Sequence, residues 1–180
     1  MGKLNNILSG SEQRFYDIIF TMATLHLLYG LPCSGKSTLA KKLEKEHPAL
    51  VLVPDEWMDR IVGDGYNDEK RAVVEAMQWE IAEKVLKLGI GVIWEGGSWN
   101  RKERDALKEK VKSIGATTKL YFLDVPHEEL LRRLKERNAN LPANTFHIKE
   151  SDLEEWMKVF EGPTADESDL IVVRYSLDNG

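Results

Sequence analysis

One short segment of the sequence has the residue types and spacing that holding a polyphosphate requires. Residues 30–38 read Gly-Leu-Pro-Cys-Ser-Gly-Lys-Ser-Thr, which fits the pattern G-x-x-x-x-G-K-[ST]. Glycines let backbone N–H groups converge on phosphate oxygens, and a helix that begins here directs the positive end of its dipole toward them. Lys36 would supply a positive charge for the β- and γ-phosphate oxygens, and Ser37 a hydroxyl for Mg²⁺. The whole loop is expected to take part in binding: Gly30, Leu31, Pro32, Cys33, Ser34, Gly35, Lys36, Ser37 and Thr38.

The segments on either side of this loop support the same interpretation. An apolar run over residues 24–29 precedes it, and an amphipathic helix is expected over residues 36–46. Strand, loop and helix in this order are the context in which the pattern binds phosphates, as a P-loop or Walker A motif. The sequence contains no Asn-Lys-x-Asp motif for reading guanine. We therefore predict ATP, with Mg²⁺, as the ligand.

Two acidic residues follow apolar segments and could contribute chemistry at the loop. Asp55 comes at the end of an expected strand over residues 50–54, and such a position borders the ligand crevice of a parallel sheet. It could accept the proton of an attacking hydroxyl group, or it could simply cap a following helix. Glu95 ends the run over residues 91–95 and could hold Mg²⁺, or be an ordinary acid at a strand end. The glycines that follow Glu95 would allow a ligand to approach closely, which favours the magnesium role.

Arginines one helical turn apart precede a polar stretch over residues 138–149 that reads as a mobile loop. Arg133 and Arg137 point the same way on an expected helix. Planar guanidinium groups match phosphate oxygens, so we expect these two residues on a lid that brings positive charge to the transferring phosphoryl group. Arg132 fits better on a solvated helix face, because glutamates at neighbouring helical positions can pair with it.

Four further residues are candidates for contact with a phosphoryl acceptor. Arg101 and Arg104 share one face of the next helix, and Trp57 and Trp99 follow the two strand-end acids. The alternative for the arginines is a solvated helix face, and for the tryptophans it is packing in the core. His26 lies within an apolar strand and is expected to be a core residue; the other histidines lack the spacing of a metal site.

Short apolar segments alternate with helical patterns from Met22 onward. The expected strands are 24–29, 50–54, 91–95, 118–124 and 170–174, and the expected helices are 36–46, 56–62, 68–88, 100–114, 127–138 and 150–159. This alternation predicts an α/β fold: a five-stranded, mostly parallel sheet with helices on both faces, together with a small arginine-bearing lid. Residues 1–21 are expected to be a peripheral arm and residues 22–180 the P-loop domain.

The composition limits the class of protein and its partners. A length of 180 residues favours one domain. A formal net charge of −5 gives the chain no general attraction to nucleic acid, so nucleic acid is the less favoured partner, although a local basic patch could still bind it. No apolar run approaches the roughly 18 residues of a membrane span, and the single cysteine fits a reducing compartment. We expect a cytoplasmic monomer or dimer that acts on a small-molecule acceptor and has no membrane contact.

Several short motifs, in order along the chain, resemble those of the AAA_33-type P-loop kinases. They are Gly30 to Thr38, Asp55-Glu56-Trp57-Met58, Trp99-Asn100-x-x-Glu103-Arg104, Leu123-Asp124-Val125-Pro126, Arg133 with Arg137-Asn138, and Phe160-Glu161-x-Pro163-x-x-Asp166-Glu167. The resemblance covers residues 22–174. In outline it extends to the kinase half of polynucleotide kinase, to chloramphenicol phosphotransferase and to zeta toxins.

The resemblance implies roles for particular residues. Lys36 and Ser37 would bind phosphates and Mg²⁺, Asp55 would be the general base, Arg133 and Arg137 would belong to the lid, and residues 160–167 would lie near the adenine. Three features depart from the pattern: Met58 stands where polynucleotide kinase has an arginine, the third strand of that kinase ends in a differently placed aspartate, and Cys33 stands where many relatives have glycine. We accordingly expect transfer of the γ-phosphoryl group of ATP to a small-molecule hydroxyl. A 5′-hydroxyl kinase for nucleic acid ends and a nucleotide-dependent switch with slow hydrolysis are the alternatives.

Overall fold

The computed structural model describes residues 22–96, 99–167 and 170–174. The arm expected over residues 1–21 lies outside the described residues, as do Gly97 and the last residues of the expected domain. The elements follow one another as β1 (Thr24–Tyr29), α2 (Lys36–Glu46), β2 (Ala49–Leu52), α3 (Pro54–Trp57), η1 (Met58–Val62), α4 (Asp68–Lys87), β3 (Gly91–Glu95), α5 (Arg101–Ser113), β4 (Thr117–Asp124), α6 (His127–Ala139), α7 (Glu150–Val159) and β5 (Leu170–Arg174).

The strands form one five-stranded sheet in the order β2-β3-β1-β4-β5, and every neighbouring pair is parallel. The central strand β1 pairs with β3 and β4, with Leu27 opposite both Trp94 and Leu120. Because parallel strands all end at the same edge, the loop after β1 and the acid that ends β3 become neighbours. The predicted α/β fold is confirmed.

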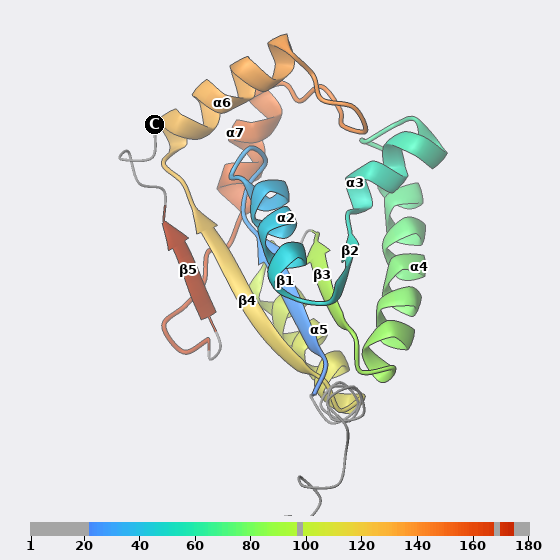
Figure 1. Cartoon of the computed structure of the whole chain (residues 1–180). Helices are drawn as coiled ribbons and strands as arrows, with labels where there is room; N and C mark the ends of the chain where they lie inside the picture. Colours follow the sequence, from blue (N-terminus) through green and yellow to red (C-terminus); the bar gives the residue numbers. More distant parts are fainter. Residues whose placement is uncertain (1–21, 97–98, 168–169, 175–180) are drawn as a thin grey trace, which may run out of the picture.

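Helices cover both faces of the sheet, as Figure 1 shows. On one face, Ala82 and Leu86 of α4 and Val111 of α5 pack with alternate β1 residues in the larger core cluster. On the other face, Ala40 and Leu43 of α2 pack on Leu28 and its neighbours. Successive β1 side chains point to opposite faces, and both faces are covered by helices, which explains why this strand is mostly apolar.

A third apolar cluster holds together the lid, which we define as α6, α7 and the connection between them. Leu130 and Leu134 of α6, Ile148 of the connection and Leu153 of α7 are all buried together. The side-chain amide of Asn138 donates to the Ile148 carbonyl at 2.6 Å, which ties the end of the connection back to α6. In Figure 1 the lid lies beyond the edge at which the central strands end. No helix in the described part of the chain is long and apolar enough to cross a membrane.

The structure corrects the expected elements after β2. The strand ends at Leu52 and not at residue 54, because Pro54 takes the first position of α3, where its missing N–H leaves no bond unmade. The helix expected over residues 56–62 therefore begins two residues earlier, and its second half, Met58–Val62, is a π-helix. Gly63 ends it in the left-handed region, with φ of 72°.

Candidate active site at the phosphate-binding loop

The loop between β1 and α2 has a glycine near each end, and its conformation requires both of them. Gly35 precedes the first residue of α2 with φ of 102°, a conformation that L side chains rarely adopt. A Cβ on Gly30 would lie 2.9 Å from the Ser34 Oγ and 3.1 Å from the Leu123 carbonyl oxygen. Cys33 also has a positive φ, 65°, which costs a non-glycine residue about 1 kcal/mol. This strained position is the one at which many relatives of the resembled kinases carry glycine.

Lys36, the first residue of α2, directs its side chain back across the loop. Its Nζ donates to the Gly30 carbonyl at 2.9 Å and to the Leu31 carbonyl at 3.1 Å. Burial lowers the pKa of this ammonium group, while the nearby carboxylates of Glu95 and Asp55 act to raise it. The loop therefore keeps a cation beside its own backbone, at the place where phosphate oxygens bind in such loops.

Ser37 and Glu95 meet where β1 and β3 end side by side. The Ser37 hydroxyl donates to Glu95 Oε1 at 2.7 Å. Glu95 Oε2 is buried and has no hydrogen-bond partner among the described residues. Burial raises the pKa of Glu95, and the charge of Lys36 and the bond from Ser37 lower it in part. A hydroxyl beside a carboxylate with one unused buried oxygen is a donor set that fits Mg²⁺.

Asp55 lies in the first turn of α3, with a side chain that is 54% exposed, and its partner is Arg71 of α4. Arg71 Nη1 lies 2.8 Å from Asp55 Oδ1, and Nη2 donates to the Gly65 carbonyl at 3.0 Å. Arg71 thereby orients the carboxylate expected to act as base. Sequence reasoning missed Arg71, because it occurs in the polar first turn of a long helix and nothing local distinguishes it from a solvated arginine.

The lid brings two of the expected arginines to the loop. Arg133 Nη1 donates to the Cys33 carbonyl at 3.2 Å, and its Nε donates to Glu129 Oε1 at 2.6 Å. Arg137, one turn further along α6, lines the cavity above the loop. Arg132 instead pairs with Glu129 and Glu136 on the exposed face of α6, as expected.

Two adjoining cavities open at this edge of the sheet. The phosphate cavity has a volume of about 530 Å³, and its lining includes Lys36, Ser37, Asp55, Glu95, Arg133 and Arg137. The second cavity, which we call the acidic cavity, has a volume of about 590 Å³ and lies between the lid and α4. Both are lined by Pro32, Asp55, Arg71, Trp99 and Ile148. Asp55 therefore stands at the junction between a phosphate-binding space and a second space of ligand size.

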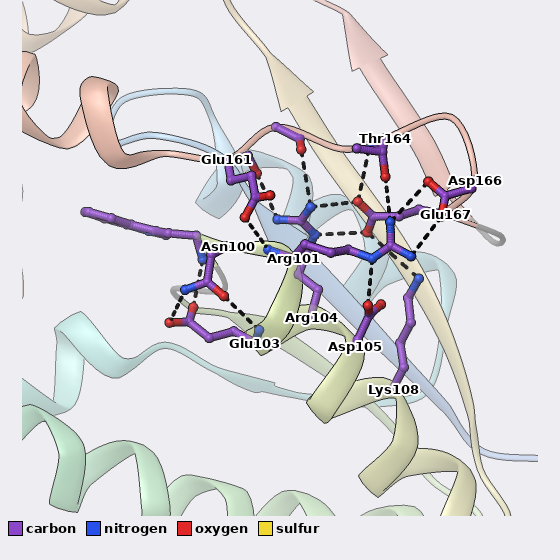
Figure 2. A network of polar contacts seen from close by, with 12 residues as sticks. Asn100, Arg101, Glu103, Arg104, Asp105, Lys108, Glu161, Thr164, Asp166 and Glu167 are labelled. Atoms are coloured by element: carbon purple, nitrogen blue, oxygen red, sulfur yellow. Dashed lines mark hydrogen bonds and ion pairs between the residues drawn. The ribbon is translucent and has the colours of Figure 1, made fainter.

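Arg101 and Arg104 line neither cavity, so the structure adds no support to the expectation that they contact the acceptor. Figure 2 shows both side chains extending from α5 to the segment that joins α7 to β5. Arg104 is fully buried and donates to Glu167 Oε1 at 2.6 Å and to Glu167 Oε2 at 2.9 Å. Arg101 bonds Asp105, Thr164 and Asp166. Their role in the structure is to anchor residues 160–167, none of which lines either cavity; the expectation that this segment lies near the adenine stays a prediction.

Of the two tryptophans expected near the acceptor, one lines the cavities and one does not. Trp99 lines both cavities, whereas Trp57 lines neither. A Cβ on Gly96 would fall 2.0 Å from Trp94 Nε1, so the Trp94 ring by itself requires glycine at this position. The close approach of a ligand is therefore not needed to explain Gly96. His26 is buried, as expected, and its Nδ1 lies 3.1 Å from the Tyr121 hydroxyl.

Solved structures share this fold. A sugar kinase from Janibacter sp. HTCC2649 is 22% identical, with a TM-score of 0.59 over 85% of each chain. Kti12 from Chaetomium thermophilum, solved with ADP-AlF3, is 20% identical, with a TM-score of 0.62 over 86% of this chain and 91% of that one. A chain of the Pnkp1/Rnl/Hen1 RNA repair complex is 21% identical, with a TM-score of 0.64 over 77% of this chain and 44% of that one.

At these identities the structural neighbours establish the fold, a P-loop NTPase fold of the kind found in kinases. No curated protein matches the sequence. The AAA_33 family, described as an AAA domain, matches residues 25–163, which include all of β1 but its first residue, β2 to β4, the phosphate-binding loop and the whole lid. The chain belongs to the AAA_33 family.

Proposed function

We propose that this protein is an ATP- and Mg²⁺-dependent kinase that transfers the γ-phosphoryl group of ATP to a hydroxyl group of a small molecule. The observation that carries the proposal is the position of Asp55, which lines both the phosphate cavity and the acidic cavity. A carboxylate at such a junction can contact an acceptor hydroxyl on one side while the phosphate-binding loop holds ATP on the other. The sugar kinase neighbour is consistent with this class of reaction.

In the proposed transfer step, residues of this chain act both on the acceptor hydroxyl and on the phosphate groups of ATP. Asp55, oriented by Arg71, accepts the proton of the acceptor hydroxyl as its oxygen forms a bond to the γ-phosphorus. The bond between that phosphorus and the β–γ bridging oxygen breaks, and ADP leaves with the electron pair. Lys36 and Arg137, the latter held in place by the rest of the lid, offset the negative charge that develops on the phosphoryl oxygens. Bound Mg²⁺, held by Ser37 and Glu95, would neutralise further phosphate charge.

The lid arginines divide this work by position. The guanidinium group of Arg133 lies on the loop carbonyls and is held by Glu129, so it fixes the lid against the loop. Arg137 lines the phosphate cavity, and among the described residues it forms no ion pair with a carboxylate. A cation in that position is available to ATP. We therefore assign the direct phosphate contact to Arg137 and the positioning of the lid to Arg133.

The proposal is tested with γ-labelled ATP, Mg²⁺, pools of hydroxylated small molecules and, in a parallel reaction, a 5′-hydroxyl oligonucleotide, following label in product and in free phosphate separately. Label should appear in product, and Lys36→Ala should reduce that transfer by orders of magnitude while the melting temperature stays close to that of the parent. Lys42→Ala, an exposed lysine of the same helix, is the matched control. Transfer that survives in Lys36→Ala would refute the proposal. Label found only in free phosphate would favour the switch, and label found only in a 5′-hydroxyl oligonucleotide would favour the nucleic acid kinase.

A further inference from the structure

The acidic cavity is positioned to hold the body of the acceptor. Its volume of about 590 Å³ falls within the range for small-molecule sites, and it shares Asp55, Arg71 and Trp99 with the phosphate cavity. A hydroxyl group placed at Asp55 therefore leaves the remainder of its molecule in this space. The charge and polarity of the residues that line the cavity should then complement those of the acceptor.

Aromatic rings from three distant parts of the chain form one wall. Tyr66 stacks on Trp156 with ring centroids 6.3 Å apart, and Trp99 meets the same Trp156 edge-on at 5.6 Å. Phe146 of the lid covers Gly65 so closely that a Cβ there would lie 2.3 Å from its ring. These contacts connect the turn before α4, the start of α5 and the lid, so the wall is built by the fold. Aromatic faces bind both apolar ring surfaces and cations.

The charged groups around the cavity are almost all negative. Six of the lining residues are carboxylates and one is an arginine. Three of the six are already engaged: Asp55 by Arg71, Glu155 by Lys158, and Glu103 by the Trp99 N–H and the Asn100 amide in a helix cap. The other three, Asp68, Glu75 and Asp152, have no cation closer than 4.0 Å among the described residues.

Glu75 is a second carboxylate of the acidic cavity that lies near Arg71. It is half-buried on α4, and its Oε1 is 4.0 Å from Arg71 Nη1, beyond hydrogen-bonding distance. Burial raises the pKa of Glu75; Arg71 opposes the rise, and the charges of Asp55 and Glu103 add to it. Asp152 also lies in the cavity wall, where it accepts a hydrogen bond from the Tyr66 hydroxyl at 2.8 Å. A cationic group here would relieve repulsion among the carboxylates and face aromatic rings at the same time.

We propose that the acceptor is an amine-bearing, hydroxylated small molecule whose protonated amine lies in the acidic cavity near Glu75 while a hydroxyl reaches Asp55. The inference rests on the proposed kinase function and specifies its substrate class. Phosphorylated acceptors and nucleic acid ends bring negative charge to the same carboxylates, so they are disfavoured. The site itself follows from the cavity and its junction with the phosphate cavity; the carboxylates determine only which charge it accepts.

The test uses matched probes in which a charged amine is replaced either by a neutral amide or by a hydroxyl group. D-glucosamine is compared with N-acetyl-D-glucosamine and D-glucose, and 2-deoxystreptamine with its di-N-acetyl derivative. Binding is measured calorimetrically at neutral pH, with Mg²⁺ and a non-hydrolysable ATP analogue present, and turnover is measured separately with ATP. Amine-bearing members should bind about 10- to 100-fold more tightly than their acetylated twins, the range expected for a hydrogen bond to a charged group.

Glu75→Gln should remove this preference and leave the affinity of the neutral twins unchanged. Glu80→Gln, an exposed glutamate on the same helix, should keep the preference. A Glu75 that served only the fold would weaken charged and neutral probes alike, so the ratio between twins distinguishes the two roles.

Equal binding of the twins, or no binding across the panel, would overturn the inference. A higher kcat/KM for a neutral acceptor or a 5′-hydroxyl oligonucleotide would also overturn it, while leaving the kinase function intact. Tight, Glu75-dependent amine binding without any phosphorylation of the panel would support the cation site and contradict the proposed reaction. The experiment therefore distinguishes an incorrect substrate class from an incorrect kinase assignment.

Discussion

Replacing Arg104 with methionine should destabilise the fold by about 3 kcal/mol, because it leaves the Glu167 carboxylate buried without its main partner. In the parent both side chains are inaccessible to solvent, and the guanidinium group bonds both Glu167 oxygens and the carbonyls of Glu161 and Gly162. Burial alone would raise the pKa of Glu167, but the bonds from Arg104 and the Thr164 N–H hold it below its usual value.

The magnitude follows from what remains around the carboxylate. Removing one partner of a buried ion pair costs about 3–5 kcal/mol. Lys108 Nζ lies 3.9 Å from Glu167 Oε2 and can partly compensate, which places the cost at the lower end of that range. For a chain of this size, each kcal/mol shifts the melting temperature by about 2–4 °C. A fall of about 10 °C is therefore expected in a thermal melt followed by circular dichroism.

Two further variants make this measurement specific to the buried pair. Arg101→Met removes a guanidinium group from the exposed part of the same network and should lower the melting temperature much less. Arg104→Met combined with Glu167→Met removes both buried charges and should recover part of the loss, because an apolar pair leaves no charge unpaired. Equal melting temperatures for Arg104→Met and Arg101→Met would refute the assignment of Arg104 as a buried anchor.

Two other expectations follow from the core and the loop. Burial, and to a lesser extent the charges of His47 and Lys119, lowers the pKa of His26 to about 4. The unfolded chain takes up this proton near pH 6.5 and the folded chain resists it, so stability should fall as the pH drops from about 6.5 toward 4, by on the order of 3 kcal/mol. Urea unfolding across that window checks this, and His26→Gln should flatten the slope; an unchanged slope would contradict it. Cys33 lines the phosphate cavity, so modification of its thiol should block ATP binding. ATP·Mg should slow that modification, as measured by mass spectrometry, and Cys33→Gly should bind ATP and be insensitive to the thiol reagent. Labelling at a rate that ATP does not change would count against this placement.

The elements and the phosphate-binding loop could be predicted because their signals are local. Glycines and prolines mark the ends of helices and strands, and one nine-residue pattern specifies the loop from Gly30 to Thr38. The error after β2 has a local cause as well. The sequence pattern predicts Pro54 as the last residue of a strand, whereas it is the first residue of α3; short apolar runs do not distinguish the two.

The rest of the site depends on contacts between segments that the sequence does not bring together. Arg71 meets Asp55 only because α4 returns alongside α3 after the π-helix. Arg104 looks like a solvated arginine on α5 until the segment after α7 covers it with Glu167, 63 positions later. The acidic cavity is lined by residues from five separate stretches of the chain, and its surplus of carboxylates exists only because the fold brings these stretches together.

The most direct test of the proposed function is phosphoryl transfer by Asp55→Asn, measured beside its affinity for ATP. Asp55 lies at the junction of the two cavities and outside the loop that holds phosphates, so the variant should bind ATP as the parent does. Transfer to acceptor should fall by about 10²–10⁴-fold, the usual contribution of a general base. Asp59→Asn, at a nearby acid that lines neither cavity, should retain both properties. Near-normal transfer in Asp55→Asn, or loss of ATP binding to the same extent as loss of transfer, would contradict the central role assigned to this carboxylate.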